Sequence, residues 1–148
     1  MGAMDAFLDF LETPTAADIY ERLDRVWQGR VDRFNRRLSE EHLPVRVANL
    51  SSIWTVLYTE PGRYNWMLQY YLRAHGLALS WIGSGRLIFS LNYSDDQFAD
   101  VLDRFVAGAK DMQRDGWWWH DERASNKSIR RRILRELIAH RFSGRHGR

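Results

Sequence analysis

Apolar residues recur at helical spacing in four stretches of the chain, which predicts four helices. Thr15 and Asp18 are typical of the start of the first helix. Gly76 is well placed as the C-terminal cap of the second. Ser94 and Gln97 have the spacing of a capping box at the start of the third, which carries the clearest apolar stripe. The helices are expected at about residues 16–41, 64–75, 94–116 and 125–142.

Between these helices lie two pairs of short segments rich in β-branched and aromatic residues, which is typical of strands. The first pair covers residues 45–50 and 53–59, and the second covers residues 77–82 and 86–91. The order of elements is therefore α-β-β-α-β-β-α with an added C-terminal helix. This order predicts an α+β fold in which helices pack on a small, mainly antiparallel sheet.

Composition limits the kinds of protein that the chain can be. With 148 residues, 45% of them hydrophobic and seven of them Trp, the chain is long and apolar enough for one folded domain. The absence of Cys excludes disulfides and thiolate metal sites. No apolar run approaches the roughly 18 residues of a membrane span, and no signal-peptide pattern opens the chain. We therefore expect a cytoplasmic protein without a membrane partner.

Charge is distributed unevenly along the chain. Residues 123–148 carry nine basic groups and one acid, whereas residues 1–122 carry 13 basic and 18 acidic groups. The domain organisation that we predict has an expression remnant at residues 1–4, a domain at residues 5–116, and a Trp-rich linker with a basic helix at residues 117–148.

The basic final segment has three interpretations. Cationic groups on one face would suit nucleic acid, and the same amphipathic pattern would suit a membrane surface. The third interpretation is a helix whose apolar face packs on the domain or on a partner, and the large apolar residues of the segment favour it, so that nucleic acid is not the expected partner. Trp117, Trp118 and Trp119 support this third interpretation, because three adjacent indoles are costly to expose.

The sequence gives little support for a metal site or a catalytic nucleophile. The five His residues are scattered without a ligand spacing, and neighbouring side chains in His120-Asp121-Glu122 would point apart, so no metal site is expected. The Gly83-Ser84-Gly85 segment is interpreted as a hairpin turn, with a phosphate cradle as the alternative. No residue of the chain is predicted to be catalytic.

Arg86 is the one candidate binding residue of the domain. It follows a Gly-rich turn and opens an apolar strand, where a planar guanidinium could bind a carboxylate with two hydrogen bonds. The alternative is an exposed arginine at a strand end without a ligand, and the residues by themselves favour that alternative.

A family resemblance is carried by residues 64–98, YNWMLQYYLRAHGLALSWIGSGRLIFSLNYSDDQF. This stretch resembles the C-terminal small domain of class III pyridoxal-phosphate-dependent aminotransferases, in particular the glutamate-1-semialdehyde aminomutase-like branch. In that family a helix ends in a Gly before a short strand, as at residues 72–79 here. A strand with a Leu-Ser core and a Ser-Asp-Asp helix start follow, as at residues 87–96.

The resemblance extends upstream. Ser51-Ser52-Ile53-Trp54 is similar to the strand opening of the family, and the helix from Ala16 is similar to its long Tyr-Glu-Arg-Leu helix. In all, the resemblance covers about residues 13–113, and the segment from Trp117 onward lies outside it.

The resemblance implies a domain of a larger enzyme. In this family pyridoxal phosphate is held by a Lys of a large domain upstream, and the parent enzyme is a homodimer. Lys110 and Lys127, the two lysines of this chain, lack the context of that Lys, so no cofactor is expected on these 148 residues alone, and the chain alone is not expected to be catalytic. The small domain would close the active site and orient the substrate, and its partner would be the large domain.

The resemblance also gives Arg86 a role. In the aminotransferase branch an Arg on this strand binds the substrate carboxylate, whereas the aminomutase branch commonly lacks it, so Arg86 favours amino-group transfer over exchange within one molecule. The usual His of the family is replaced near Asn92-Tyr93, which leaves the substrate open. The alternative function is a non-catalytic domain that binds another protein through Trp117–Trp119 and the final helix.

Overall fold

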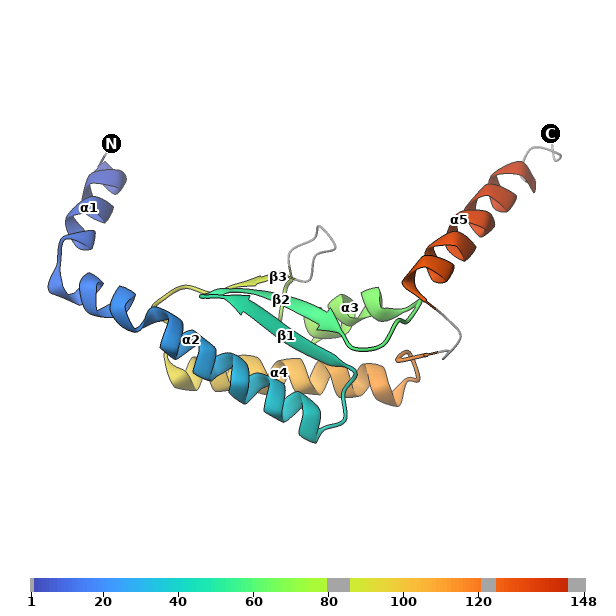
Figure 1. The fold of residues 1–148 in the computed structure, drawn as a ribbon, viewed down its shortest axis with the longest axis horizontal. Coiled ribbons are helices and arrows are strands. Elements are labelled where there is room, and N and C mark those ends of the chain that lie inside the picture. The colour runs from blue at the N-terminus through green and yellow to red at the C-terminus, as the bar shows by residue number, and fades with distance from the viewer. Residues whose placement is uncertain (1, 80–85, 121–124, 144–148) are drawn as a thin grey trace.

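The computed structural model describes residues 2–79, 86–120 and 125–143, and it confirms an α+β fold. Figure 1 shows helices α2 and α4 side by side below one face of the sheet, with α3 near the end of β2. The elements are α1 (Gly2–Leu11), α2 (Pro14–Glu40), β1 (Val45–Leu50), β2 (Ile53–Tyr58), a 3₁₀ turn (Asn65–Met67), α3 (Leu68–Ala74), β3 (Arg86–Ile88), α4 (Asp95–Arg114) and α5 (Asn126–Ser143).

The described strands form an antiparallel sheet in the order β1-β2-β3. Leu50 pairs with Ile53 across a two-residue turn, and Ile53 pairs in turn with Ile88, so these three residues form one row across the sheet. Side chains alternate between the two faces of a strand, which places the row on a single face.

The core lies between the sheet and the two long helices and is largely aromatic. Trp54 from β2 contacts Trp27 and Phe34 from α2 edge to face, with ring centroids 6.1 and 5.4 Å apart. Phe98 from α4 lies 5.4 Å from Trp54, so a single indole joins the sheet to both helices. Aromatic pairs of this geometry stabilise a core beyond the area that they bury.

Local signals set the helix ends. Ser94 and Gln97 form the predicted capping box of α4. Gly76 has φ +82°, and the N–H groups of Gly76 and Leu77 donate to the carbonyls of Arg73 and Leu72, which confirms Gly76 as the cap of α3. At the start of α2 the cap is Thr13 instead of Thr15, because Pro at the first helical position moves the helix start upstream.

The second predicted strand pair is wrong in part. Residues 77–79 form no strand, and residues 80–85, which include Gly83-Ser84-Gly85, lie outside the described residues. The strand predicted over residues 86–91 ends at Ile88. It ends there because Ile88 pairs with Ile53, the first residue of β2, and the next backbone bond, from the Phe89 N–H to the Ser52 carbonyl, is made to the turn between β1 and β2.

Two helices project from opposite ends of this body (Figure 1). α1 begins at Gly2, within the segment expected to be an expression remnant, and none of its residues is buried. α5 rises from the other end, and its described side chains are exposed or half-buried.

Of the helices that the structure describes, none combines the length and the apolarity that crossing a membrane requires.

Candidate functional site

The outer face of the sheet, turned away from α2 and α4, carries Arg86. Because Leu87 is buried on the helix side, its neighbours Arg86 and Ile88 face outward. The row of Leu50, Ile53 and Ile88 lies on this outer face, with Leu50 78% and Ile88 72% exposed. Aliphatic residues that contact one another across three strands form a contiguous apolar patch, which is typical of a surface that another body covers.

Arg86 also borders a depression of about 340 Å³ beside β3. Leu77, Phe89 and Tyr93 contribute to its walls, so it combines apolar surface with one guanidinium and one phenol. Within the described residues, neither the Arg86 guanidinium nor the Tyr93 hydroxyl has a hydrogen-bond partner. An arginine without a carboxylate partner at the edge of such a depression can bind an anionic group with two N–H donors.

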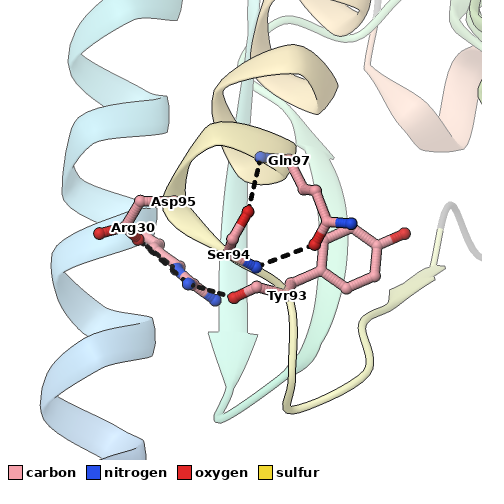
Figure 2. A network of polar contacts seen from close by, with 5 residues as sticks. All are labelled: Arg30, Tyr93, Ser94, Asp95 and Gln97. Carbon is pink, nitrogen blue, oxygen red and sulfur yellow. Dashed lines mark hydrogen bonds and ion pairs between the residues drawn. The ribbon is translucent and has the colours of Figure 1, made fainter.

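Tyr93 is held at this depression by Arg30, a residue that sequence analysis missed. Arg30 is only 6% exposed, and its Nη2 donates to the Tyr93 carbonyl at 2.7 Å and to Asp95 Oδ1 at 3.1 Å. Its guanidinium lies 4.6 Å from the Trp27 ring centroid and 5.3 Å from that of Phe98. Figure 2 shows this network, with the Tyr93 ring directed away from Arg30.

The position of Arg30 could have been found from helical spacing. Trp27, Val31 and Phe34 are buried on α2, and Arg30 lies on the same side of the helix, three residues after Trp27. A charged residue at a core-facing position requires polar partners, and the loop before α4 supplies them. Arg30 therefore fixes the loop that joins β3 to α4.

Neither lysine of the chain is placed to hold pyridoxal phosphate. Lys110 Nζ lies 2.7 Å from Glu41 Oε2 in an exposed ion pair, and the hydrogen bond from Lys110 holds the pKa of Glu41 below its usual value. Lys127 lies on α5. Neither borders the depression at Arg86, so these residues do not fit the cofactor, and a cofactor lysine would have to come from outside this chain.

The three adjacent tryptophans have different surroundings. The Trp118 indole N–H donates to the Ala109 carbonyl at 3.0 Å, and the Trp117 ring lies 5.2 Å from that of Tyr64. Both indoles pack against the core of this chain. Trp119 is 45% exposed, so of the three it has the most surface left for another protein. Docking through the block stays a prediction.

A polar cluster joins α3 to α4. His75 Nε2 lies 2.8 Å from Asp111 Oδ2, and the Tyr71 hydroxyl donates to Asp115 at 2.7 Å. The hydrogen bond from His75, with help from Arg114, holds the pKa of Asp111 below its usual value.

The described part of the chain contains no group of three His, Asp or Glu side chains that could hold a metal ion. In the His120-Asp121-Glu122 segment, His120 contacts the Pro61 carbonyl, while Asp121 and Glu122 lie outside the described residues.

Comparison with known proteins relates this fold to one enzyme class. No family model matches the sequence, and neither does any curated protein. Among solved structures, the chain is similar to a protein described as "Transaminase with PLP bound", with a TM-score of 0.56 and 21% identity over 72% of this chain. The match covers 26% of that transaminase, so this chain corresponds to about a quarter of it. The fold of this chain is therefore similar to that of a part of this transaminase.

Proposed function

We propose that the chain is the C-terminal domain of a pyridoxal-phosphate-dependent aminotransferase or aminomutase of the glutamate-1-semialdehyde aminomutase type. In this proposal it closes the active site and binds the substrate carboxylate through Arg86. The observation that carries the proposal is the fold shared with part of a transaminase that has the cofactor bound. Because the chain corresponds to only a quarter of that protein, the cofactor and the chemistry would belong to the remainder.

The outer face of the sheet supports this role. A large domain that covers Leu50, Ile53 and Ile88 would remove the exposed aliphatic row from water, which stabilises the assembly by about 25 cal/mol for each Å² buried. Arg86 lies next to this row on the same face, so covering the row would bring the guanidinium to the boundary between the two domains. Small-molecule sites are found preferentially at such boundaries.

Within this site Arg86 would supply position and charge, and no proton transfer. Its two N–H donors would fix a substrate carboxylate in one orientation, and closure of the domain would exclude water from the ion pair. Tyr93, held by Arg30, borders the same depression and offers a hydroxyl to a second polar group of the substrate.

The test uses the parent protein that contains this chain, with Arg86→Ala as the variant. Loss of a charge-assisted bidentate contact should raise KM for a carboxylate substrate about 10- to 100-fold, with a smaller change in kcat. The absorbance of a lysine-bound cofactor near the visible edge should be unchanged in the variant, since Arg86 does not hold the cofactor.

Arg46→Ala is the matched control. Arg46 is exposed on the outer face of the sheet like Arg86, but it lies on β1, the far edge strand. Its removal should leave KM unchanged. A parent protein without cofactor absorbance would contradict the whole proposal, whereas an unchanged KM in Arg86→Ala would remove only Arg86 from the site.

Exposed Trp119 and α5 favour a second candidate, a non-catalytic domain that binds another protein. This candidate would be favoured over the first if the parent protein had no bound cofactor and formed a stable complex with another protein that was lost in Trp119→Ala.

A further inference from the structure

The two projecting helices carry matching apolar stripes. On α1, Met4, Phe7, Leu8 and Leu11 follow the spacing i, i+3, i+4, i+7, so they line one side of the helix. All four are exposed, Phe7 by 50%. On α5, Leu134, Leu137 and Ile138 follow the same spacing over one turn, and Leu137 is 63% exposed. Isolated exposed apolar residues are common, but two complete stripes of this kind are not.

The charges beside the two stripes are opposite in sign. Asp5, Asp9 and Glu12 lie next to one another on one flank of the α1 stripe, and α1 has no basic residue. The α5 stripe is bracketed by Arg130, four residues before Leu134, and Arg141, four residues after Leu137. Within the described part of the chain, none of these charged groups has an ion-pair partner.

The body of the same chain leaves the apolar stripes of both helices exposed. The only acid of α5, Glu136, is bound by Arg63 and Arg132 on the side that faces the body. α1 and α5 project from opposite ends of the body (Figure 1), so they cannot meet within one molecule. A shallow hollow of 370 Å³ lined by Arg130, Leu134 and Leu137 also leaves room on α5 for a large side chain.

We propose that α1 of one copy of this chain packs against α5 of a second copy. The apolar stripes would meet, with Phe7 in the hollow beside Leu134 and Leu137, and the acidic flank of α1 would lie beside the basic α5. Across a two-fold axis each copy would offer its α1 to the α5 of its partner, so both pairs would form in one closed dimer. This proposal goes beyond the transaminase-related function and leaves the face that carries Arg86 free.

The test measures the mass of the full 148-residue chain by sedimentation equilibrium. The chain should be a dimer at about 100 µM, where a complex with micromolar Kd is almost fully formed, and added salt should weaken it. Two variants reverse the charges: Asp5→Lys/Asp9→Lys makes α1 basic, and Arg130→Glu/Arg141→Glu makes α5 acidic. Each alone should be mainly monomeric at this concentration, with Kd raised more than about 100-fold by repulsion.

An equal mixture of the two variants should regain the dimer, because the basic α1 of one variant then meets the acidic α5 of the other, while the unmodified acidic α1 meets the unmodified basic α5 at the second contact. Loss of the dimer in each variant alone separates pairing of α1 with α5 from pairing of like helices, because like helices carry like charges before and after the reversal. Asp103→Lys, a reversal at an exposed position on α4, is the matched control and should dimerise like the unmodified chain. Circular dichroism of each variant checks that the helices are intact.

A monomeric chain at about 100 µM overturns the proposal, and so does a dimer that both variants retain or a mixture that stays monomeric. A monomer that instead sediments with phosphatidylserine vesicles would assign α5 to a lipid surface. None of these results bears on the cofactor absorbance or the Arg86 kinetics of the parent protein, so the two proposals fail separately.

Discussion

Arg30 shows how one charged residue can belong to an aromatic core. Its guanidinium stacks on Trp27 and Phe98, which are core residues, while its N–H donors reach the Tyr93 carbonyl and Asp95. Burial of an arginine is costly unless its charge is paired and its donors are satisfied, and both conditions are met here. The Asp95 side chain is mostly exposed, so the free-energy cost of burying charge in this pair falls mainly on Arg30.

Replacement of Arg30 tests this account. Arg30→Ala should lower the free energy of unfolding by about 2 kcal/mol, because the Tyr93 carbonyl loses its donor and two aromatic rings lose a cation. Arg30→Lys should recover only part, since an ammonium lacks the planar fork that reaches both acceptors. Urea denaturation measures the difference. Arg33→Ala, an exposed site on the same helix, should change stability by less than about 0.5 kcal/mol, and an equal loss at both sites would contradict the account.

The sequence predicted the place of single residues where their near neighbours in the chain determine it. The sequence placed Arg86 at the start of a strand, and the structure has it there at the edge of a depression. Helical spacing places Arg30 on the core side of α2, but its partners lie 63 and 65 residues away in the chain and no local pattern identifies them. The contacts of Trp117 with Tyr64 and of Trp118 with Ala109 likewise depend on the fold, so the sequence could not predict them.

At the scale of elements, α3 lies against α4 through a small residue and a polar pair. A Cβ atom at Gly108 would lie 3.2 Å from the Leu72 side chain and the Tyr71 backbone, so glycine permits the close approach of the two helices. His75 and Asp111 then lie within hydrogen-bond distance across the helix interface. Packing and polar contacts thus hold α3 at the edge of the sheet.

The Asp111 contact predicts a pH dependence. Because the folded-state pKa of Asp111 is lowered, mainly by the hydrogen bond from His75, the pair stabilises the protein above the unfolded pKa of about 4. This stabilisation is lost as the pH falls through the folded pKa. Asp111→Asn should therefore lower the urea midpoint at pH 7, and the variant and the unmodified chain should converge as the pH falls below the unfolded pKa of about 4 and through the lower folded pKa. Asp103→Asn, at an exposed site on α4, should show no such convergence, and a constant difference at all pH values for Asp111→Asn would be evidence against the pair.

Helices were predicted better than strands. The capping box at Ser94 and the glycine cap at Gly76 are local signals, and both ends lie where they were expected. The end of β3 depends on where its partner strand begins, since Ile88 pairs with Ile53, the first residue of β2, and no pattern within residues 86–91 reports that pairing. α1 was not predicted, because the first residues were interpreted as an expression remnant, although their apolar spacing extends to Leu11.

At the scale of the whole molecule, one compact body carries two outlying helices (Figure 1). The aromatic core joins α2, α4 and the sheet, and Trp117 and Trp118 close it after α4. α5 contacts this body through the Glu136–Arg63 ion pair and buries none of its described side chains. The charge difference along the chain therefore coincides with a structural division.

Two truncations test this division. A chain ending at residue 120 should keep the melting temperature of the full chain to within about 2 °C, because no described side chain of α5 is fully buried. A chain ending at residue 116 should lose about 3 kcal/mol, since it lacks the two packed indoles. Calorimetry measures both. Equal melting temperatures for the two truncations would mean that Trp117 and Trp118 do not stabilise the body.

The contact between Arg30 and Asp95 has a consequence for the order of events during synthesis. The two residues are separated by 65 positions, which a ribosome adding about 5–20 residues each second takes roughly 3–13 s to cover. During that interval Trp54, which packs on Trp27 and Phe34, has been made but Phe98 has not, so α2 can pack on the sheet before its partners on α4 exist. Synthesis of α4 then supplies Asp95 and Phe98, so this helix completes the core of the domain.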